Sequence, residues 1–78
     1  MDEEEKGLRE EVKKKDESAW VHFELTEYLY KKKRFEEAKK EFIRTLECDP
    51  GWSQTYLLLL DYYKEIKKDV LDYLAKNK

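Results

Sequence analysis

The fold is decided by residues 19–52, AWVHFELTEYLYKKKRFEEAKKEFIRTLECDPGW, which hold two helical patterns separated by a basic turn. Side chains of the first pattern recur three or four residues apart at His22, Leu25, Thr26 and Leu29. Those of the second pattern recur at Phe35, Ala38, Phe42, Thr45 and Leu46. The cations of Lys31–Arg34 suit the C-terminal end of a helix, and Pro50 stops the next one. The stretch therefore predicts a helix that ends among these cations and a second helix from about Phe35 to Cys48.

The residues before this pair predict another helix, over residues 2–16. Asp2 is a good N-cap residue, and the carboxylates of Glu3–Glu5 follow in the first turn, where the helix dipole favours negative charge. Asp16 and Ser18 are alternative N-caps for the helix that comes next.

The residues after Pro50 continue at helical spacing nearly to the end of the chain. The apolar series comprises Tyr56, Leu59, Leu60, Tyr63, Ile66, Val70 and Leu74. This segment forms one helix, or two if Asp69 caps a separate final helix after Lys67–Lys68. Because Leu57–Leu60 covers every side of a helix, we expect this helix to be buried nearly all round. Together the patterns predict an all-α fold of antiparallel helix pairs, with four or so helices.

A displacement of the chain by 34 residues brings its apolar positions into register. The superimposed pairs are Leu8 with Phe42, Val12 with Leu46, Asp16 with Pro50, His22 with Tyr56, Leu25 with Leu59, Thr26 with Leu60, and Leu29 with Tyr63. In this period, and in the motif His22-x2-Leu25-Thr26-x2-Leu29, Ala38-x3-Phe42, Pro50, the sequence resembles the tetratricopeptide repeat (TPR) family. The next copy opens as Tyr56-x2-Leu59-Leu60-x2-Tyr63. The resemblance implies that Ala38 is small where paired helices cross, that Phe42 fills the gap between pairs, and that Pro50 turns the chain.

The resemblance implies that residues 1–78 form a single TPR-like domain with three parts. Residues 2–16 resemble the second helix of a preceding repeat, residues 19–52 form a complete repeat, and residues 53–78 supply the first helix of the next repeat plus a capping segment. A half repeat at the start is equally expected of a piece of a longer array. The departures from the family pattern are His22 in place of an aromatic, Leu60 in place of a small residue, Lys33-Arg34 in place of Gly and an acidic residue, and Asp72 in place of Ala.

Composition narrows the function. The chain has 78 residues, 46% of them charged, with a net charge of -2, which disfavours a nucleic-acid binder that relies on a broad positive field. Its single Cys and single His do not form a metal-site or nucleophile pattern, so we expect no enzyme, no catalytic residues, no metal and no cofactor. The longest apolar run is too short for a membrane span, and the chain is expected to be cytoplasmic. The many Lys and Glu residues are typical of hyperthermophile proteins, but also of any solvated helical surface.

The family likeness implies a groove lined by the first helix of each pair. Its partner-binding residues on the first of these helices are Trp20, Phe23, Glu24, Glu27, Tyr30 and Lys31. Those on the second are Leu57, Leu58, Asp61 and Lys64, with Gln54 and Glu65 beside them. This face is too apolar to stand idle in solvent, so something must cover it.

Three occupants of this face remain open at the level of sequence. The first helix, through Leu8 and Val12, and the C-terminal segment could cover it within the chain. A second copy could cover it in a homodimer, which we expect at tens of micromolar. A protein or peptide partner could also bind there; the carboxylate clamp of chaperone-binding TPR proteins is absent, and an amphipathic helix with a basic flank fits better.

A nucleic-acid or ribonucleoprotein accessory role is the alternative from another class. It would use two basic clusters, Lys13–Lys15 and Lys31–Arg34. Compensation of helix dipoles explains both clusters without a ligand. The sequence therefore favours a protein-interaction module, which binds a partner or itself.

Overall fold

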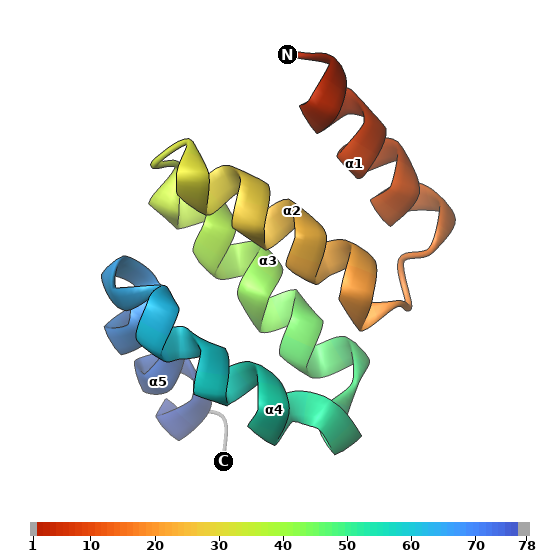
Figure 1. Cartoon of the computed structure of the whole chain (residues 1–78). Helices are drawn as coiled ribbons and strands as arrows, with labels where there is room; N and C mark the ends of the chain where they lie inside the picture. Colours follow the sequence, from red (N-terminus) through yellow and green to blue (C-terminus); the bar gives the residue numbers. More distant parts are fainter. Residues whose placement is uncertain (1, 77–78) are drawn as a thin grey trace.

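The computed structural model describes residues 2–76, and within this range every regular element is helical (Figure 1). The elements are α1 (Glu3–Lys14), α2 (Ala19–Lys31), α3 (Phe35–Cys48), the 3-10 turn η1 (Pro50–Trp52), α4 (Ser53–Leu58), the 3-10 turn η2 (Leu59–Tyr62) and α5 (Lys64–Lys76). The predicted all-α fold is confirmed; the predicted segment 53–78 extends two residues beyond the described range. α1 and α3 each run antiparallel to α2, and α4 runs in the direction of α2 on the other side of α3 (Figure 1).

The first helix begins where the sequence predicts. The carboxylate of Asp2 accepts a hydrogen bond from the backbone N–H of Glu5, at 2.8 Å, and satisfies one of the free donors of the first turn. Glu3–Glu5 lie in that turn, and Lys13 and Lys14 lie in the last one. Charge thus complements the helix dipole at both ends.

The N-terminus of α2 is organised by His22 rather than by a capping side chain. Ser18 occupies the N-cap position but makes no capping hydrogen bond with its hydroxyl. His22 is 2% exposed, as expected of a packed histidine. Its Nε2 lies 2.9 Å from the carbonyl oxygen of Asp16, and its Nδ1 lies 2.8 Å from a carboxylate oxygen of Glu41 on α3. Through these two contacts the ring ties the α1–α2 connection to α3.

The turn between α2 and α3 is a Schellman motif. The N–H of Arg34 donates to the carbonyl of Leu29, and the N–H of Lys33 donates to the carbonyl of Tyr30, both at 2.9 Å. Lys33 has a φ of 62°, in the left-handed region that this motif requires. Glycine adopts this conformation without cost, so Lys33 is strained here. α3 then spans Phe35–Cys48, as predicted.

Two apolar clusters form the core. One joins α2 and α3 to the C-terminal elements through Phe23, Phe42, Leu46, Leu60, Ile66 and Val70. The other joins α1 to the α2–α3 pair through Leu25, Tyr28, Leu29 and Ala38, with Leu8 and Val12 partly buried against it. Of the repeat-motif residues, those that are fully buried are His22, Leu25, Thr26, Leu29, Ala38, Phe42 and Leu60. Tyr56, Leu59 and Tyr63 are half-buried, and Pro50 is exposed.

The segment after Ser53 forms two helices, but the break is not at Asp69. α4 tightens into η2 at Leu59, Tyr63 leaves helical geometry with φ -117° and ψ 53°, and α5 begins at Lys64. Asp69 therefore lies inside α5 and caps nothing. The Tyr63 ring packs within 6.2 Å of the rings of Phe23, Tyr30 and Phe42 (centroid to centroid). Anchoring this ring turns the chain early, so that Ile66 and Val70 return against α3.

The expectation that Leu57–Leu60 is buried on all sides is wrong for this chain. Leu60 is 1% exposed and Leu57 and Leu59 are half-buried, but Leu58 is 74% exposed. α4 packs on α3 and is covered on its other sides only in part, because α5 lies along α3 rather than over α4. The outer face of α4 remains open.

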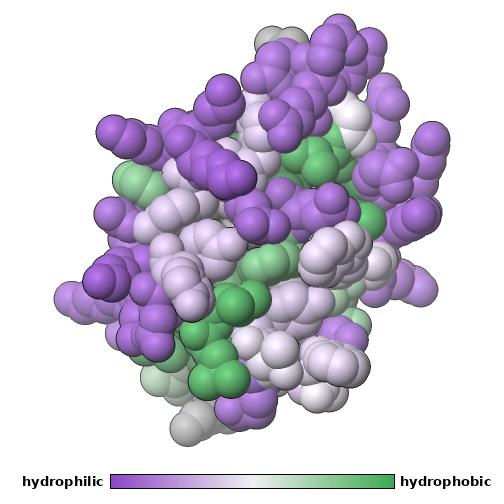
Figure 2. Space-filling view, viewed as in Figure 1, coloured by the Kyte–Doolittle hydropathy of each residue, from purple (hydrophilic) through white to green (hydrophobic). Residues whose placement is uncertain are grey.

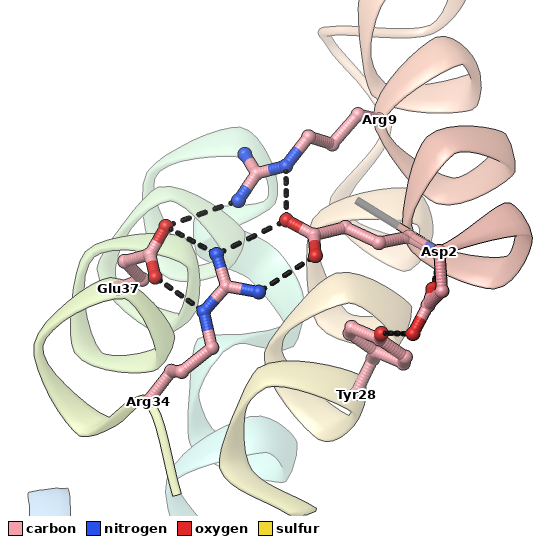
Figure 3. A network of polar contacts seen from close by, with 6 residues as sticks. Asp2, Arg9, Tyr28, Arg34 and Glu37 are labelled. Atoms are coloured by element: carbon pink, nitrogen blue, oxygen red, sulfur yellow. Dashed lines mark hydrogen bonds and ion pairs between the residues drawn. The ribbon is translucent and has the colours of Figure 1, made fainter. Parts of the chain in front are cut away.

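A polar network fastens α1 to the α2–α3 pair (Figure 3). Glu5 is 4% exposed, and its carboxylate receives two hydrogen bonds from Arg34, at 2.6 and 3.0 Å, and one from Arg9, at 2.8 Å. Glu37 accepts hydrogen bonds from the same two arginines. Arg34 above all, and then Arg9, lower the pKa of Glu5 to about 2. The hydroxyl of Tyr28 also donates to Asp2, so the start of α1 is held at two points.

Candidate functional site

The predicted groove residues of α2 divide between two hollows. Glu24, Glu27 and Lys31 line a polar hollow of about 400 Å³ between α1 and α2, together with Glu4, Leu8, Tyr28 and Lys32. Trp20 and Phe23 line an apolar hollow of about 420 Å³ between α2 and α4. The structure therefore separates the charged part of the predicted site from its aromatic part.

The apolar hollow, called here the tryptophan groove, lies at the N-terminal ends of α2 and α4. Its lining residues are Trp20, Phe23, Asp49, Trp52, Thr55, Tyr56 and Leu59. Trp20 comes from the first turn of α2, and Trp52 from η1, directly after the Pro50-Gly51 turn. The two indoles are 58% and 61% exposed. Both tryptophans of the chain thus stand open at one groove.

Phe23 forms the floor of this groove, which corrects its expected position on the open face. The side chain is 6% exposed and belongs to the core cluster. Its ring centroid lies 5.4 Å from that of Tyr56, 6.1 Å from that of Trp20 and 6.4 Å from that of Phe42. These rings fill the space between α2 and α4. Phe23 was expected to contact a partner, but it lies beneath the exposed Trp20 and Trp52.

The tryptophan groove does not continue along the C-terminal half of α2, because aromatic rings fill the space on that side of the helix. Tyr30 packs edge-on against Tyr63 at 4.9 Å and against Phe35 at 5.2 Å, and its hydroxyl donates to Glu65 on α5. Burial, assisted by Glu27, raises the pKa of Tyr63 to about 12. The tryptophan groove is therefore closed at this end.

The predicted residues of α4 and η2 do not line either hollow. Leu57 packs partly against the core, whereas Leu58 is exposed on the outer face of α4. Asp61 pairs with Lys67 at 2.7 Å, which lowers the pKa of its carboxyl, and Lys64 is exposed at the start of α5. Tyr62, on the η2 turn that follows, is 77% exposed. Figure 2 shows green and pale side chains gathered over the region of α4, with purple ones around them.

The in-chain covering expected from Leu8, Val12 and the C-terminal segment does not reach the tryptophan groove. Leu8 and Val12 pack on the other side of α2, against the cluster of Leu25 and Leu29. α5 packs on α3. Tyr56 and Tyr63 cover Phe23, and the indoles above it remain open.

Sequence reasoning missed Trp52 and Asp49 as site residues. The available signal was a Trp directly after the only Pro-Gly turn of the chain. Trp52 ends this turn, directly before the start of α4, and is 61% exposed.

The remaining reactive or charged groups do not assemble a second site. Cys48 is half-buried, donates to the carbonyl of Asp16 at 3.3 Å, and has its thiol pKa raised by burial. Residues 2–76 hold no cluster of ligands suited to a metal ion. No helix in this range is long and apolar enough to cross a bilayer. Lys13–Lys15 and Lys31–Arg34 lie at the C-terminal ends of two antiparallel helices, at opposite ends of the α1–α2 pair (Figure 1).

Comparison of the chain with protein-family models, with curated proteins and with solved structures gives no match.

Proposed function

We propose that this chain is a non-enzymatic, TPR-like protein-interaction module that receives a segment of a partner protein in the tryptophan groove. The observation that carries the proposal is the pair of open indoles, Trp20 and Trp52, above an aromatic floor. Exposed tryptophans gathered at one concave site are costly to leave in water, and Trp is among the residues that contribute most at protein interfaces. The position of the groove between two parallel helices matches the face that TPR arrays use.

The hollow suits a polypeptide better than a small molecule. It is open along one side, so a compact ligand would leave much of its own surface in water. A helix or extended segment could anchor one side chain there and lie across the neighbouring Leu59 and Thr55.

The experiment uses the two tryptophans as the reporter. A phage library of random 12-residue peptides is selected on the immobilised protein, and synthetic versions of the enriched peptides are titrated by tryptophan emission. Because both tryptophans line the groove, a peptide that binds there shifts the emission to shorter wavelength, whereas one that binds elsewhere leaves it unchanged.

Two truncations make the result specific. Trp52→Ala should weaken binding by about tenfold or more, as expected of a hot-spot residue. Tyr62→Ala, which removes an equally exposed aromatic outside the groove, should leave it unchanged. The absence of any peptide that shifts the emission would contradict the proposal.

The nucleic-acid alternative predicts a different result. Binding of a generic RNA that uses the lysine clusters would weaken steeply with salt. A slope near zero would remove this alternative, and the separation of the two clusters supports that expectation.

A further inference from the structure

The lining of the tryptophan groove is both aromatic and acidic. Four of its seven residues are aromatic, Asp49 is its single charged residue, and it holds no Lys, Arg or His. The face of an aromatic ring is electrostatically negative and attracts cations, and Trp does so most strongly. We infer that the tryptophan groove receives a cationic side chain, a lysine or an arginine, of the partner segment. This inference rests on the proposed function and narrows the partner to a basic one.

The carboxylate of Asp49 is free to meet such a cation. Within residues 2–76 no hydrogen bond or ion pair engages its side chain; only its backbone carbonyl acts, as the acceptor for Trp52 N–H at 3.0 Å. By contrast, the carboxylates of Glu5, Asp16, Glu37 and Asp61 are all paired with basic residues. An unpaired carboxylate beside two open indoles is what a cation-binding groove needs.

The end of α3 adds to the negative potential at this place. Asp49 is the C-cap of α3, where the helix dipole is negative, and the last turn of α3 contains no basic residue. The ends of α1, α2 and α5 do carry lysines in their last turns. Among these four helices, only the one that ends at the groove therefore lacks a compensating cation of its own.

The neighbouring polar hollow also favours a cationic ligand, because carboxylates of α1 and α2 line it. Glu4, Glu24 and Glu27 line it, and no ion pair in the described part of the chain engages these three carboxylates. Lys31 and Lys32 lie at its other end, at the C-terminus of α2. A partner segment that crosses the N-terminal part of α2 thus meets aromatic rings and carboxylates, and a second basic residue in it would face Glu24.

The test compares two peptides that differ only in charge. The probe is the tightest-binding synthetic peptide obtained from the 12-residue library, with any Lys first changed to Arg and each Arg then replaced in turn by citrulline, which keeps the length and planar shape of arginine without its charge. At one position the replacement should weaken binding by about tenfold, the order of a cation–π contact partly removed from water. The tryptophan emission should still respond, because the site remains the same.

The variant Asp49→Asn tests whether the carboxylate in the groove binds the positive charge of the peptide. This variant should weaken binding of the cationic peptide several-fold and leave the citrulline peptide unchanged. Asp72→Asn, which makes the same change in net charge on an exposed residue of α5, is the control and should affect neither peptide. Because no hydrogen bond or ion pair within residues 2–76 engages the Asp49 side chain, the variant should fold normally, and its helicity checks this.

The outcomes separate the two claims. If peptides shift the tryptophan emission but carry no basic residue, or tolerate citrulline throughout, the cationic partner is wrong and the protein-binding function stands. If no peptide shifts the emission, both fail. If citrulline weakens binding but Asp49→Asn has the same effect as Asp72→Asn, the cation binds outside the groove and the inference is overturned.

Discussion

Lys33 has a backbone conformation that glycine adopts more easily than lysine does. Among residues 2–76 it is the only non-glycine residue with positive φ, at 62°. An L-residue in this region costs about 1–2 kcal/mol, and glycine avoids most of that. Lys33→Gly should therefore raise the free energy of unfolding by about 1 kcal/mol, measured by urea denaturation. Lys32→Gly is the matched control: at φ -84° glycine relieves no strain, so this variant should lose about 0.5–1 kcal/mol. Equal effects of the two variants would contradict the assignment of strain.

His22 is the residue where the chain departs from the aromatic of the TPR pattern. His22→Phe fits a ring into the same place but removes the contacts of the two ring nitrogens with the carbonyl of Asp16, which also accepts from Cys48, and with the half-buried carboxylate of Glu41. A typical hydrogen bond contributes about 0.5–1.5 kcal/mol, so we expect a loss of about 1–2 kcal/mol in urea denaturation. Arg44→Gln breaks the exposed ion pair of Arg44 with Asp16 and should lose less than about 1 kcal/mol. A stable His22→Phe variant would mean that those two bonds contribute little.

At the scale of the elements, α1 is held by an ion-pair network as well as by apolar contact. Its apolar stripe, Leu8 and Val12, is only half-buried, while the Glu5 carboxylate lies buried between Arg34 and Arg9. The folded-state pKa of Glu5 is about 2, below its ordinary value of 4.5. A depressed carboxyl pKa contributes stability that is fully present above the unfolded-state pKa and is lost as the pH falls toward the folded-state value.

Glu5→Gln should therefore be less stable than the unmodified chain at pH 7, and this difference should shrink between pH 4.5 and about 2. Urea denaturation at a series of pH values measures it. Glu10→Gln, an exposed change on the same helix, should show no such pH-dependent difference. Glu37, whose pKa is also lowered by Arg34, is present in all three chains, so a gap that persists unchanged at pH 2 would rule out Glu5 as the source.

Local signals made some elements predictable and left others out of reach. Asp2, the basic turn and Pro50 act on their own neighbours, so the start of α1 and both ends of α3 follow from the sequence. The break at Tyr63 depends on rings that come from α2 and α3, whereas the sequence of the segment alone allowed one helix, or two with a break before Asp69. The burial of Phe23 under the groove could not be predicted for the same reason: it needs Tyr56 and Tyr63 from a distant segment.

At the scale of the whole molecule, the α2–α3 helix pair is covered by α1 and α5, but in the described part of the chain α4 has no helix packed on its outer face. α1 shields one side of the pair, and α5 returns against α3. Nothing in residues 2–76 covers the outer face of α4, where Leu58 is 74% exposed, and Tyr62 on the following η2 turn is 77% exposed. A small domain gains from further burial of such a face, because its own core is limited.

We expect this face to meet its counterpart in a two-fold dimer with a dissociation constant of tens of micromolar, equivalent to about 6 kcal/mol of association free energy. Light scattering during gel filtration over a range of concentrations measures the mass. Leu58→Glu should give a monomer throughout, because the carboxylate would be buried opposite its own copy, and it should leave helicity unchanged since Leu58 makes few contacts in the monomer. Leu71→Glu, a matched change on the half-exposed face of α5, should still dimerise. A monomer mass for the unmodified chain at every concentration would contradict the dimer. If only Leu71→Glu dissociated the dimer, the interface would lie on α5 instead of α4.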